Sequence, residues 1–295
     1  MIKIVITGGK GQLALDCVEV LSPRFEVLSP GSKDLDITSY ESVERLILNT
    51  HPQVILNCAA FTQVDLCETK QDQAWRVNAD GPRNLAAAAA KAGARLIHIS
   101  TDYVFDGRKP VPEPYTEGDD TNPLSWYGKT KLAAEAAVRD AIDNHVILRT
   151  AWMYGIWGRN FLKTMLKLAI ENPERGLRVV NDQFGSPTWS YRLALQIEKL
   201  IESKLQGIYH ATSEGFCTWY ELATGFLDRM GVSHNVTPCT TAEYPTAATR
   251  PLNSILENRR LKESRLNLMQ AWETDLAEFV LKFRERLIIE ASGER

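Results

Sequence analysis

The hydrophobic positions of this chain form short apolar runs that alternate with stretches of helical spacing. Five runs dominated by apolar and β-branched residues predict strands, at residues 2–7, 25–28, 54–59, 96–100 and 146–149. Four stretches with helical spacing lie between them, at residues 13–21, 39–48, 75–93 and 125–141. Near-continuous apolar runs are typical of strands buried on both faces of a parallel sheet. The alternation therefore predicts an α/β fold, a doubly wound Rossmann sheet with right-handed crossovers.

The alternation stops near residue 150. Beyond it, helical stretches at 161–170, 189–203 and 219–230 are separated by loops rich in Pro, Gly and Thr. We expect residues 1–150 to form a dinucleotide-binding Rossmann domain. Residues 151–295 are expected to form mainly a smaller, mostly helical substrate-binding domain, with some segments returning to the first domain.

A glycine-rich loop follows the first predicted strand directly. Gly8, Gly11 and Ala14 give the spacing G-x-x-G-x-x-A, with a strand before it and a helix after it. Glycines at these positions allow a tight turn and a close approach of the backbone to a pyrophosphate at the helix N-terminus. We therefore expect this loop, including Gln12 and Leu13, to bind a dinucleotide cofactor.

The turn after the second predicted strand bears on the choice of cofactor. Folds that prefer NAD usually carry a carboxylate there, which holds the ribose 2′-hydroxyl. This chain instead offers Ser29, Ser32 and Lys33, which can meet a 2′-phosphate. These residues favour NADPH, whereas Asp34 and Asp36 close by leave NADH open.

Composition points to a small-molecule partner. The formal charge of −3 over 295 residues excludes a strongly basic surface for nucleic acid or membranes. The five cysteines are scattered and form no C-x-x-C pair, so we expect reduced thiols. The first apolar run is too short for a signal peptide, and we expect a cytoplasmic protein.

Tyr127 and Lys131 lie four residues apart on a predicted helix and therefore share one face. A lysine ammonium near a phenol is expected to lower the phenol pKa, which would help proton exchange with a substrate oxygen. Thr101 ends the fourth predicted strand, where ligands bind in such sheets, and can donate a hydrogen bond to the same oxygen. A surface Tyr/Lys pair and a simple strand-end threonine are the alternatives.

Seven stretches together resemble the extended short-chain dehydrogenase/reductases and, among them, the dTDP-4-dehydrorhamnose reductase (RmlD-type) family. They are GGKGQLA at 8–14, NCAAFTQVD at 57–65, STDYVFDG at 100–107, YGKTKLAAE at 127–135, RTAWMYG at 149–155, NDQFGSPT at 181–188 and YPTAATRPLNS at 244–254. The resemblance spans nearly the whole chain. It implies NAD(P)H-dependent reduction of the C4 ketone of dTDP-4-dehydro-L-rhamnose to dTDP-L-rhamnose.

The resemblance also implies roles for individual residues. Tyr127 would give the proton, Lys131 would also bind the nicotinamide ribose, and Thr101 would hold the carbonyl. Cofactor-binding positions are Gly8, Gly11, Gln12, Leu13, Ser32, Lys33, Asp36, Cys58, Ala59, Ala60 and Asn78, with Tyr127 and Lys131. Substrate-binding positions are Thr62, Val64, Asp65, Tyr103, Trp152, Asn160 and Arg250. Trp152 as a core aromatic and Arg250 in a structural ion pair are the alternatives.

Some features leave the function open. Phe61 and Ala151 depart from the commonest family pattern and leave the exact sugar undecided. One alternative is a non-catalytic NADP-binding regulatory subunit that resembles methionine adenosyltransferase β, and another is a reductase or epimerase of a different nucleotide sugar. A dehydratase is disfavoured because Tyr103, not a second acid, follows Asp102. The histidines show no metal-ligand spacing; some family members bind Mg²⁺ at a dimer contact, and both Mg²⁺ and a homodimer are left undecided.

Overall fold

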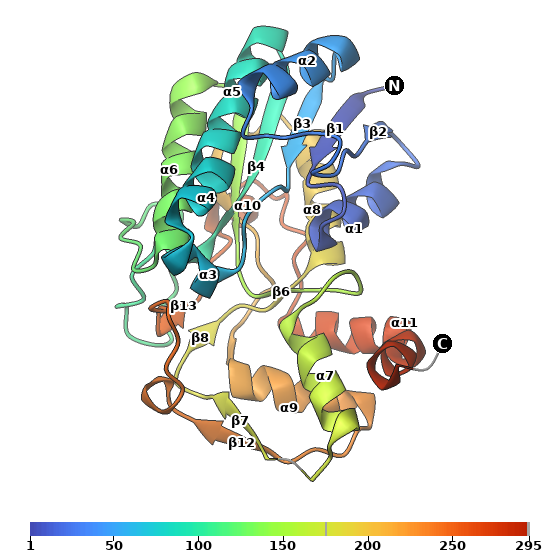
Figure 1. Ribbon diagram of the computed structural model, residues 1–295, viewed down its shortest axis with the longest axis vertical. Helices are drawn as coiled ribbons and strands as arrows, with labels where there is room; N and C mark the ends of the chain where they lie inside the picture. The colour runs from blue at the N-terminus through green and yellow to red at the C-terminus, as the bar shows by residue number, and fades with distance from the viewer. Residues whose placement is uncertain (175, 294–295) are drawn as a thin grey trace.

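A computed structural model describes residues 1–174 and 176–293, and its centre is a six-stranded parallel sheet (Figure 1). The strand order is β10-β5-β4-β3-β1-β2. The strands are β1 (Lys3–Thr7), β2 (Glu26–Leu28), β3 (Val54–Asn57), β4 (Arg95–Thr101), β5 (His145–Thr150) and β10 (Gly207–His210). All five pairings are parallel, so the predicted doubly wound sheet is confirmed.

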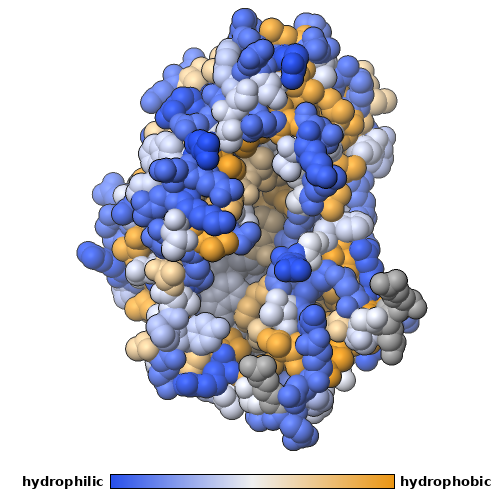
Figure 2. Space-filling model, viewed as in Figure 1, coloured by the Kyte–Doolittle hydropathy of each residue, from blue (hydrophilic) through white to orange (hydrophobic). Residues whose placement is uncertain are grey.

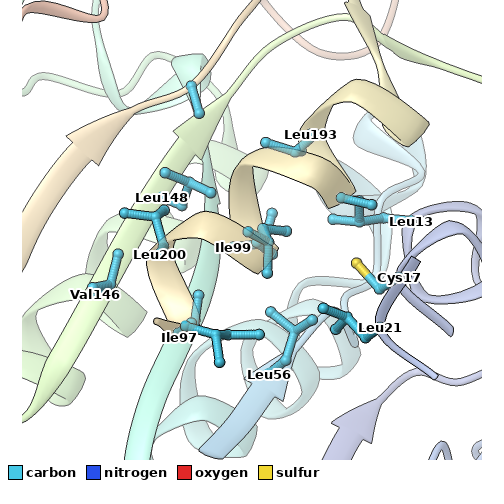
Figure 3. Packing of buried hydrophobic residues seen from close by; sticks show 14 of the residues in the cluster. Leu13, Cys17, Leu21, Leu56, Ile97, Ile99, Val146, Leu148, Leu193 and Leu200 are labelled. Atoms are coloured by element: carbon cyan, nitrogen blue, oxygen red, sulfur yellow. The ribbon is translucent and has the colours of Figure 1, made fainter. Parts of the chain in front are cut away.

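Helices cover both faces of this sheet. One face carries α2 (Tyr40–Thr50), α5 (Gly81–Ala92) and α6 (Trp126–Ala141), and the other carries α1 (Gln12–Leu21) and α8 (Ser190–Ile201). Figure 3 shows Leu13, Cys17 and Leu21 of α1 beside Leu193 and Leu200 of α8 over the sheet. Burial of these side chains is the main force that holds the two helices on the strands. The short helix α10 (Arg259–Glu263) packs near β10.

The helix predicted over residues 75–93 is built from three pieces. α4 (Gln71–Trp75) leads into a π-helical turn at Arg76–Asp80, which continues as α5 to a left-handed Gly93. Asn78 lies in the π-helical turn and is fully buried. Its side chain pairs with both backbone groups of Phe61, at 2.7 Å to the N–H and 3.0 Å to the carbonyl oxygen. The π turn thus holds the loop after β3, which precedes α3 (Val64–Thr69).

A second hydrophobic core lies in the lower lobe of Figure 1. Its helices are α7 (Phe161–Glu171), α9 (Trp219–Met230) and α11 (Trp272–Ser292). Tyr154, Trp189, Phe226 and Phe279 pack at its centre. Among the described residues, no helix is both long enough and apolar enough to cross a membrane.

Short paired strands lie between the two lobes and along the border of the lower lobe. β6 (Met153–Tyr154) pairs with β9 (Thr188–Trp189), and β7 (Leu177–Val180) pairs with β12 (Val236–Cys239). β8 (Phe184–Gly185) lies between β11 (Cys217–Thr218) and β13 (Asn253–Ser254). Short 3₁₀ turns occur at Asp102–Val104 and Thr241–Glu243.

A buried carboxylate joins α1 to α8. Asp16 is 1 % exposed and accepts a hydrogen bond from Ser190, the first residue of α8. Burial raises the pKa of Asp16 to about 6. The folded protein therefore binds this proton more tightly than the unfolded chain does, so its stability falls as the pH rises from about 4 through about 6.

Asp16→Asn is expected to stabilise the protein at pH 8 by about 1 to 3 kcal/mol, because the asparagine removes the cost of a buried charge and can still accept from Ser190. The gain is expected to shrink toward zero below about pH 3, where the aspartate is protonated in both states. Urea unfolding at several pH values measures it. Asp140→Asn, at an exposed position, is the control, and an equal gain at every pH would contradict the role of the Asp16 charge.

Candidate active site

A cavity of about 440 Å³ lies at the carboxyl ends of the central strands. Figure 2 shows a deep hollow on this face between the two lobes. The lining includes predicted cofactor, catalytic and substrate positions: Gly11, Gln12, Leu13, Cys58, Ala59, Ala60, Thr62, Val64, Thr101, Tyr103, Tyr127, Lys131 and Trp152. The fold therefore brings the phosphate loop and the proposed catalytic residues to one space.

The phosphate loop has no room for a side chain at Gly8 or Gly9. A Cβ at Gly8, whose φ is +71°, would lie 2.8 Å from the Ala59 Cα, and one at Gly9 would lie 2.2 Å from the Ser29 carbonyl oxygen. Gly11 caps α1 and provides no side chain to accept from the first-turn N–H groups. Those groups are therefore available to a phosphate, as expected for a dinucleotide site.

The first turn of α6 places the proposed catalytic pair. Ser125 caps this helix by accepting from the Gly128 N–H at 3.2 Å. A Cβ at Gly128 would lie 2.2 Å from the Tyr103 carbonyl oxygen, so only glycine lets the helix approach this closely. The rings of Tyr103 and Tyr127 then meet edge to face, with centroids 5.7 Å apart.

The expected lowering of the Tyr127 pKa by Lys131 is wrong for this structure. Burial withdraws the phenol from water and raises the Tyr127 pKa above its ordinary value, against a smaller opposing effect of the nearby Thr101 hydroxyl. The Lys131 ammonium donates to the carbonyl oxygen of Ile99 at 2.5 Å, and burial lowers its pKa to about 8. Tyr127 is thus protonated near neutral pH, which is the form that can give a proton to a substrate oxygen.

The predicted hydrogen bond from Thr101 to a substrate carbonyl is not preformed. The Thr101 hydroxyl donates to Asp102 Oδ1 at 2.9 Å and accepts from the Tyr103 N–H at 3.2 Å. Asp102 is 2 % exposed, and burial raises its pKa to about 6. The hydroxyl proton must therefore leave this carboxylate before it can reach a substrate. Asp102 is adjacent to Thr101 in the sequence, but its burial could not be read from the motif.

Trp152 lines the cavity in a strained backbone conformation with φ of 44°. Its indole stacks on Trp219 of α9, with ring centroids 3.6 Å apart and an angle of 8° between the planes. A Cβ at Gly185 would lie 2.4 Å from the Trp152 ring, so the glycine of the NDQFGSPT stretch makes room for the indole. Sequence reasoning missed Trp219, although its aromatic position at the start of a predicted helix was visible.

The RmlD substrate binding domain family model matches residues 2–285, almost the whole chain. The chain belongs to the RmlD family.

Relatives and a solved structure agree with this membership. A dTDP-4-dehydrorhamnose reductase from Aggregatibacter actinomycetemcomitans is 40% identical over 90% of this chain and 93% of its own. A dTDP-4-keto-6-deoxy-D-glucose reductase from Streptomyces niveus is 38% identical over 93% of this chain and 95% of its own. The crystal structure of a dTDP-4-dehydrorhamnose reductase from Bacillus anthracis in complex with NADP superposes with a TM-score of 0.92, at 38% identity over 96% of this chain and 100% of that chain. This RmlD-family chain is an oxidoreductase.

Two predicted substrate residues of this RmlD-family chain pair with each other. Arg250 Nη2 lies 2.7 Å from Asp65 Oδ2, and Nη1 lies 3.1 Å from Oδ1. The guanidinium holds the pKa of the Asp65 carboxyl below its usual range. The ion pair that the sequence left as an alternative for Arg250 is therefore present, and it ties α3 to the segment before β13.

Asn160 also holds parts of the RmlD-family fold together. Its Nδ2 donates to Gln12 Oε1 at 2.9 Å, and its Oδ1 caps α7 by accepting from the Lys163 N–H at 3.1 Å. This side chain thus links the lower lobe to the phosphate loop. Arg159 beside it lines the active-site cavity and was missed by sequence reasoning.

The turn after β2 is exposed at Ser32, Lys33 and Asp36. Asp36 Oδ1 accepts from the Thr38 N–H at 2.9 Å and from its hydroxyl at 2.7 Å. Lys10 lies over this turn, because a Cβ at Gly31 would be 3.3 Å from its Cε. The RmlD-family chain therefore offers a second cation, Lys10, that the sequence analysis did not single out.

Proposed function

We propose that this protein reduces the C4 ketone of a nucleotide-linked deoxysugar with NADPH, converting dTDP-4-dehydro-L-rhamnose to dTDP-L-rhamnose. The observation that carries the proposal is the meeting of Thr101, Tyr127 and Lys131 in one cavity with the phosphate loop. The glycines of the loop keep side chains away from the start of α1, and the first-turn N–H groups of this helix have no capping side chain. Both features suit the pyrophosphate of the cofactor.

The residues have distinct tasks in this reaction. When bound, the reduced nicotinamide supplies a hydride to the ketone carbon. Tyr127 gives its phenolic proton to the ketone oxygen as a general acid. Lys131 holds the cofactor ribose from the same helix face, and Thr101 donates to the ketone oxygen once its proton is released from Asp102.

A second cavity supports a nucleotide-linked substrate. It has a volume of about 360 Å³ and shares the lining residue Trp219 with the first cavity. Arg178 and Arg250 line it together with the aromatic ring of Tyr244. Guanidinium groups suit a diphosphate, and an aromatic ring suits a nucleobase. The ketosugar would then lie in the first cavity, and the nucleoside diphosphate in the second.

The relatives' names support the same class of substrate but differ in the sugar. Both named relatives act on a dTDP-linked 4-ketosugar by their names, one on dehydrorhamnose and the other on 4-keto-6-deoxy-D-glucose. Ala151, one of the positions where this chain departs from the commonest family pattern, lines the cavity beside Trp152. We therefore take dTDP-4-dehydro-L-rhamnose as the proposed substrate and the second sugar as the alternative to test.

Turnover with a small panel of ketosugars tests the function. The purified chain is mixed with NADPH and with dTDP-4-dehydro-L-rhamnose, dTDP-4-dehydro-6-deoxy-D-glucose or the UDP-linked counterpart. We expect loss of NADPH absorbance to be fastest with the first. Faster reduction of another sugar would reassign the substrate. Silence with all three, in a chain that still binds NADPH, would favour a regulatory subunit.

Arg250→Ala is expected to raise KM for the nucleotide sugar by about tenfold or more, because a diphosphate contact is lost, and to change kcat less. Asp65→Asn is the matched control, since it breaks the ion pair but keeps the guanidinium. Steady-state kinetics of both variants measure this. Equal effects of the two variants would mean that Arg250 acts only through the pair.

We also propose NADPH as the preferred cofactor, held at its 2′-phosphate by Lys33 and Lys10. Lys33→Glu is expected to weaken NADPH binding by about 1 to 3 kcal/mol and NADH binding much less, through loss of a charge-assisted hydrogen bond. Fluorescence titration of both cofactors measures the difference, and Lys10→Glu tests the second cation. Lys199→Glu, exposed on α8, is the control. Equal weakening of NADPH and NADH would place the discrimination elsewhere.

A further inference from the structure

Three buried polar side chains lie behind Lys131 and are not used by the reaction described above. Thr7 Oγ1 lies 2.6 Å from Asn57 Oδ1, Asn57 Nδ2 lies 2.9 Å from His98 Nδ1, and His98 Nε2 lies 3.4 Å from Lys131 Nζ. Each of the four residues is at most 2 % exposed. They form a continuous polar chain across β1, β3, β4 and α6. Polar groups are costly to bury, so such a chain calls for an explanation.

The direction of the hydrogen bonds follows from Asn57. Its Oδ1 accepts from the Thr7 hydroxyl at 2.6 Å and from the Ala59 N–H at 3.1 Å. Its amide nitrogen therefore faces His98 and donates to Nδ1. Burial and the nearby Lys131 charge hold the pKa of His98 well below its ordinary value, so the ring is neutral. Its one proton then lies on Nε2, the atom that faces Lys131.

This arrangement sets the surroundings of the Lys131 amine. A charged ammonium has only donors, so it cannot form a hydrogen bond with a His98 Nε2–H. A neutral amine has a lone pair that can accept from this N–H, while it still donates to Ile99. The geometry therefore favours the neutral amine relative to the ammonium, in the same direction as burial.

Other titratable groups also face Lys131. Glu135 lies one turn further along α6, and its carboxylate is held by Arg149 of β5 at 2.9 and 2.7 Å. Cys58, after β3, and Glu135 both raise the Lys131 pKa, against the larger effect of burial. Tyr127 lies one turn earlier on the helix, with its phenol protonated. His98 is the group on β4 that contacts the amine directly.

We propose that His98 is a positioning residue for Lys131, which holds the lysine amine against β4 and sets how readily that amine gives up its proton. Asn57 and Thr7 fix the ring in the orientation this needs. This series of hydrogen bonds ends at Thr7, which is fully buried beneath the phosphate loop. We therefore take it to fix the position of the His98 proton and not to carry protons to solvent. This inference rests on the catalytic role proposed for Lys131, and the test below is independent of turnover.

Titration of the lysine side chains by NMR tests this in the full chain. Lysines are labelled with ¹³C at Cε, and the Lys131 signal is assigned by its loss in Lys131→Met. We expect Lys131 to titrate below the exposed lysines in the wild type. In His98→Gln its midpoint is expected to rise by about 1 pH unit, because the new amide oxygen has two lone pairs and can accept from the ammonium as well as from Asn57. The pH profile of kcat is expected to shift in the same direction.

His210→Gln is the matched control, because His210 is equally buried on β10 of the same sheet. Its Lys131 midpoint should match the wild type. If His98→Gln does not fold, His98→Asn keeps a partner for Asn57 and removes the opposing donor, so a smaller rise is expected. An unchanged midpoint in the His98 variants, or the same rise in His210→Gln, would overturn the proposal. If Lys131 titrates as expected but the protein reduces none of the ketosugars, the proposed function is refuted and the role of His98 stands.

Discussion

Tyr127→Phe is expected to lower kcat by about 10² to 10⁴ while leaving the dissociation constant of NADPH nearly unchanged. The substitution removes one hydroxyl and keeps the ring, so the edge-to-face contact with Tyr103 survives. Because the phenol is protonated near neutral pH, it is the group placed to deliver the proton to the ketone oxygen. Single-turnover and steady-state kinetics with the proposed ketosugar give the chemical step.

A second phenol in the same sheet controls for loss of a hydroxyl. Tyr209 of β10 is 4 % exposed, and Tyr209→Phe should retain turnover. Turnover of Tyr127→Phe at the wild-type rate would remove the general-acid role and leave the ring as a packing residue.

Lys131→Met is expected to impair both cofactor binding and turnover, because the lysine is proposed to hold the cofactor ribose and so to position the nicotinamide against the ketone. Methionine keeps much of the buried volume but loses the charge and the hydrogen bond to Ile99. We expect the NADPH dissociation constant to rise about tenfold and kcat to fall by about 10² or more. Fluorescence titration and kinetics measure the two effects separately.

Lys129→Met provides a comparison within the same helix, since Lys129 is exposed on α6. It should bind NADPH and turn over substrate as the wild type does. A Lys131→Met protein with normal cofactor affinity would show that the ribose contact is not made by this residue, even if the rate falls.

The fold was largely predictable because its signals are local. Apolar runs and helical spacing marked the five strands up to residue 150 and the helices α1, α2, α5 and α6 that pack on them. The π-helical turn at Arg76–Asp80 was not visible, because its cause is the pairing of Asn78 with the distant Phe61 backbone. The β7–β12 pairing was missed for the same reason, as it joins segments far apart in the sequence.

The candidate site was predictable where the spacing of residues along the sequence is enough to place their side chains together. Tyr127 and Lys131 share a helix face, and the cavity between the lobes receives both. Charge effects could not be predicted, since the Tyr127 pKa depends on how far the fold withdraws the phenol from water. The contact between Arg250 and Asp65 likewise depends on where the last third of the chain returns.

The stacked indoles of Trp152 and Trp219 also bear on how this pocket can be redesigned. Any side chain at position 185 would displace the Trp152 ring, so position 185 can be varied only together with position 152. A library that randomises Trp152 alone replaces the indole mainly by smaller side chains, which leave unfilled the space beside Gly185. A library that exchanges bulk between the two positions keeps the wall filled and moves the space for the sugar from one side of the pocket to the other.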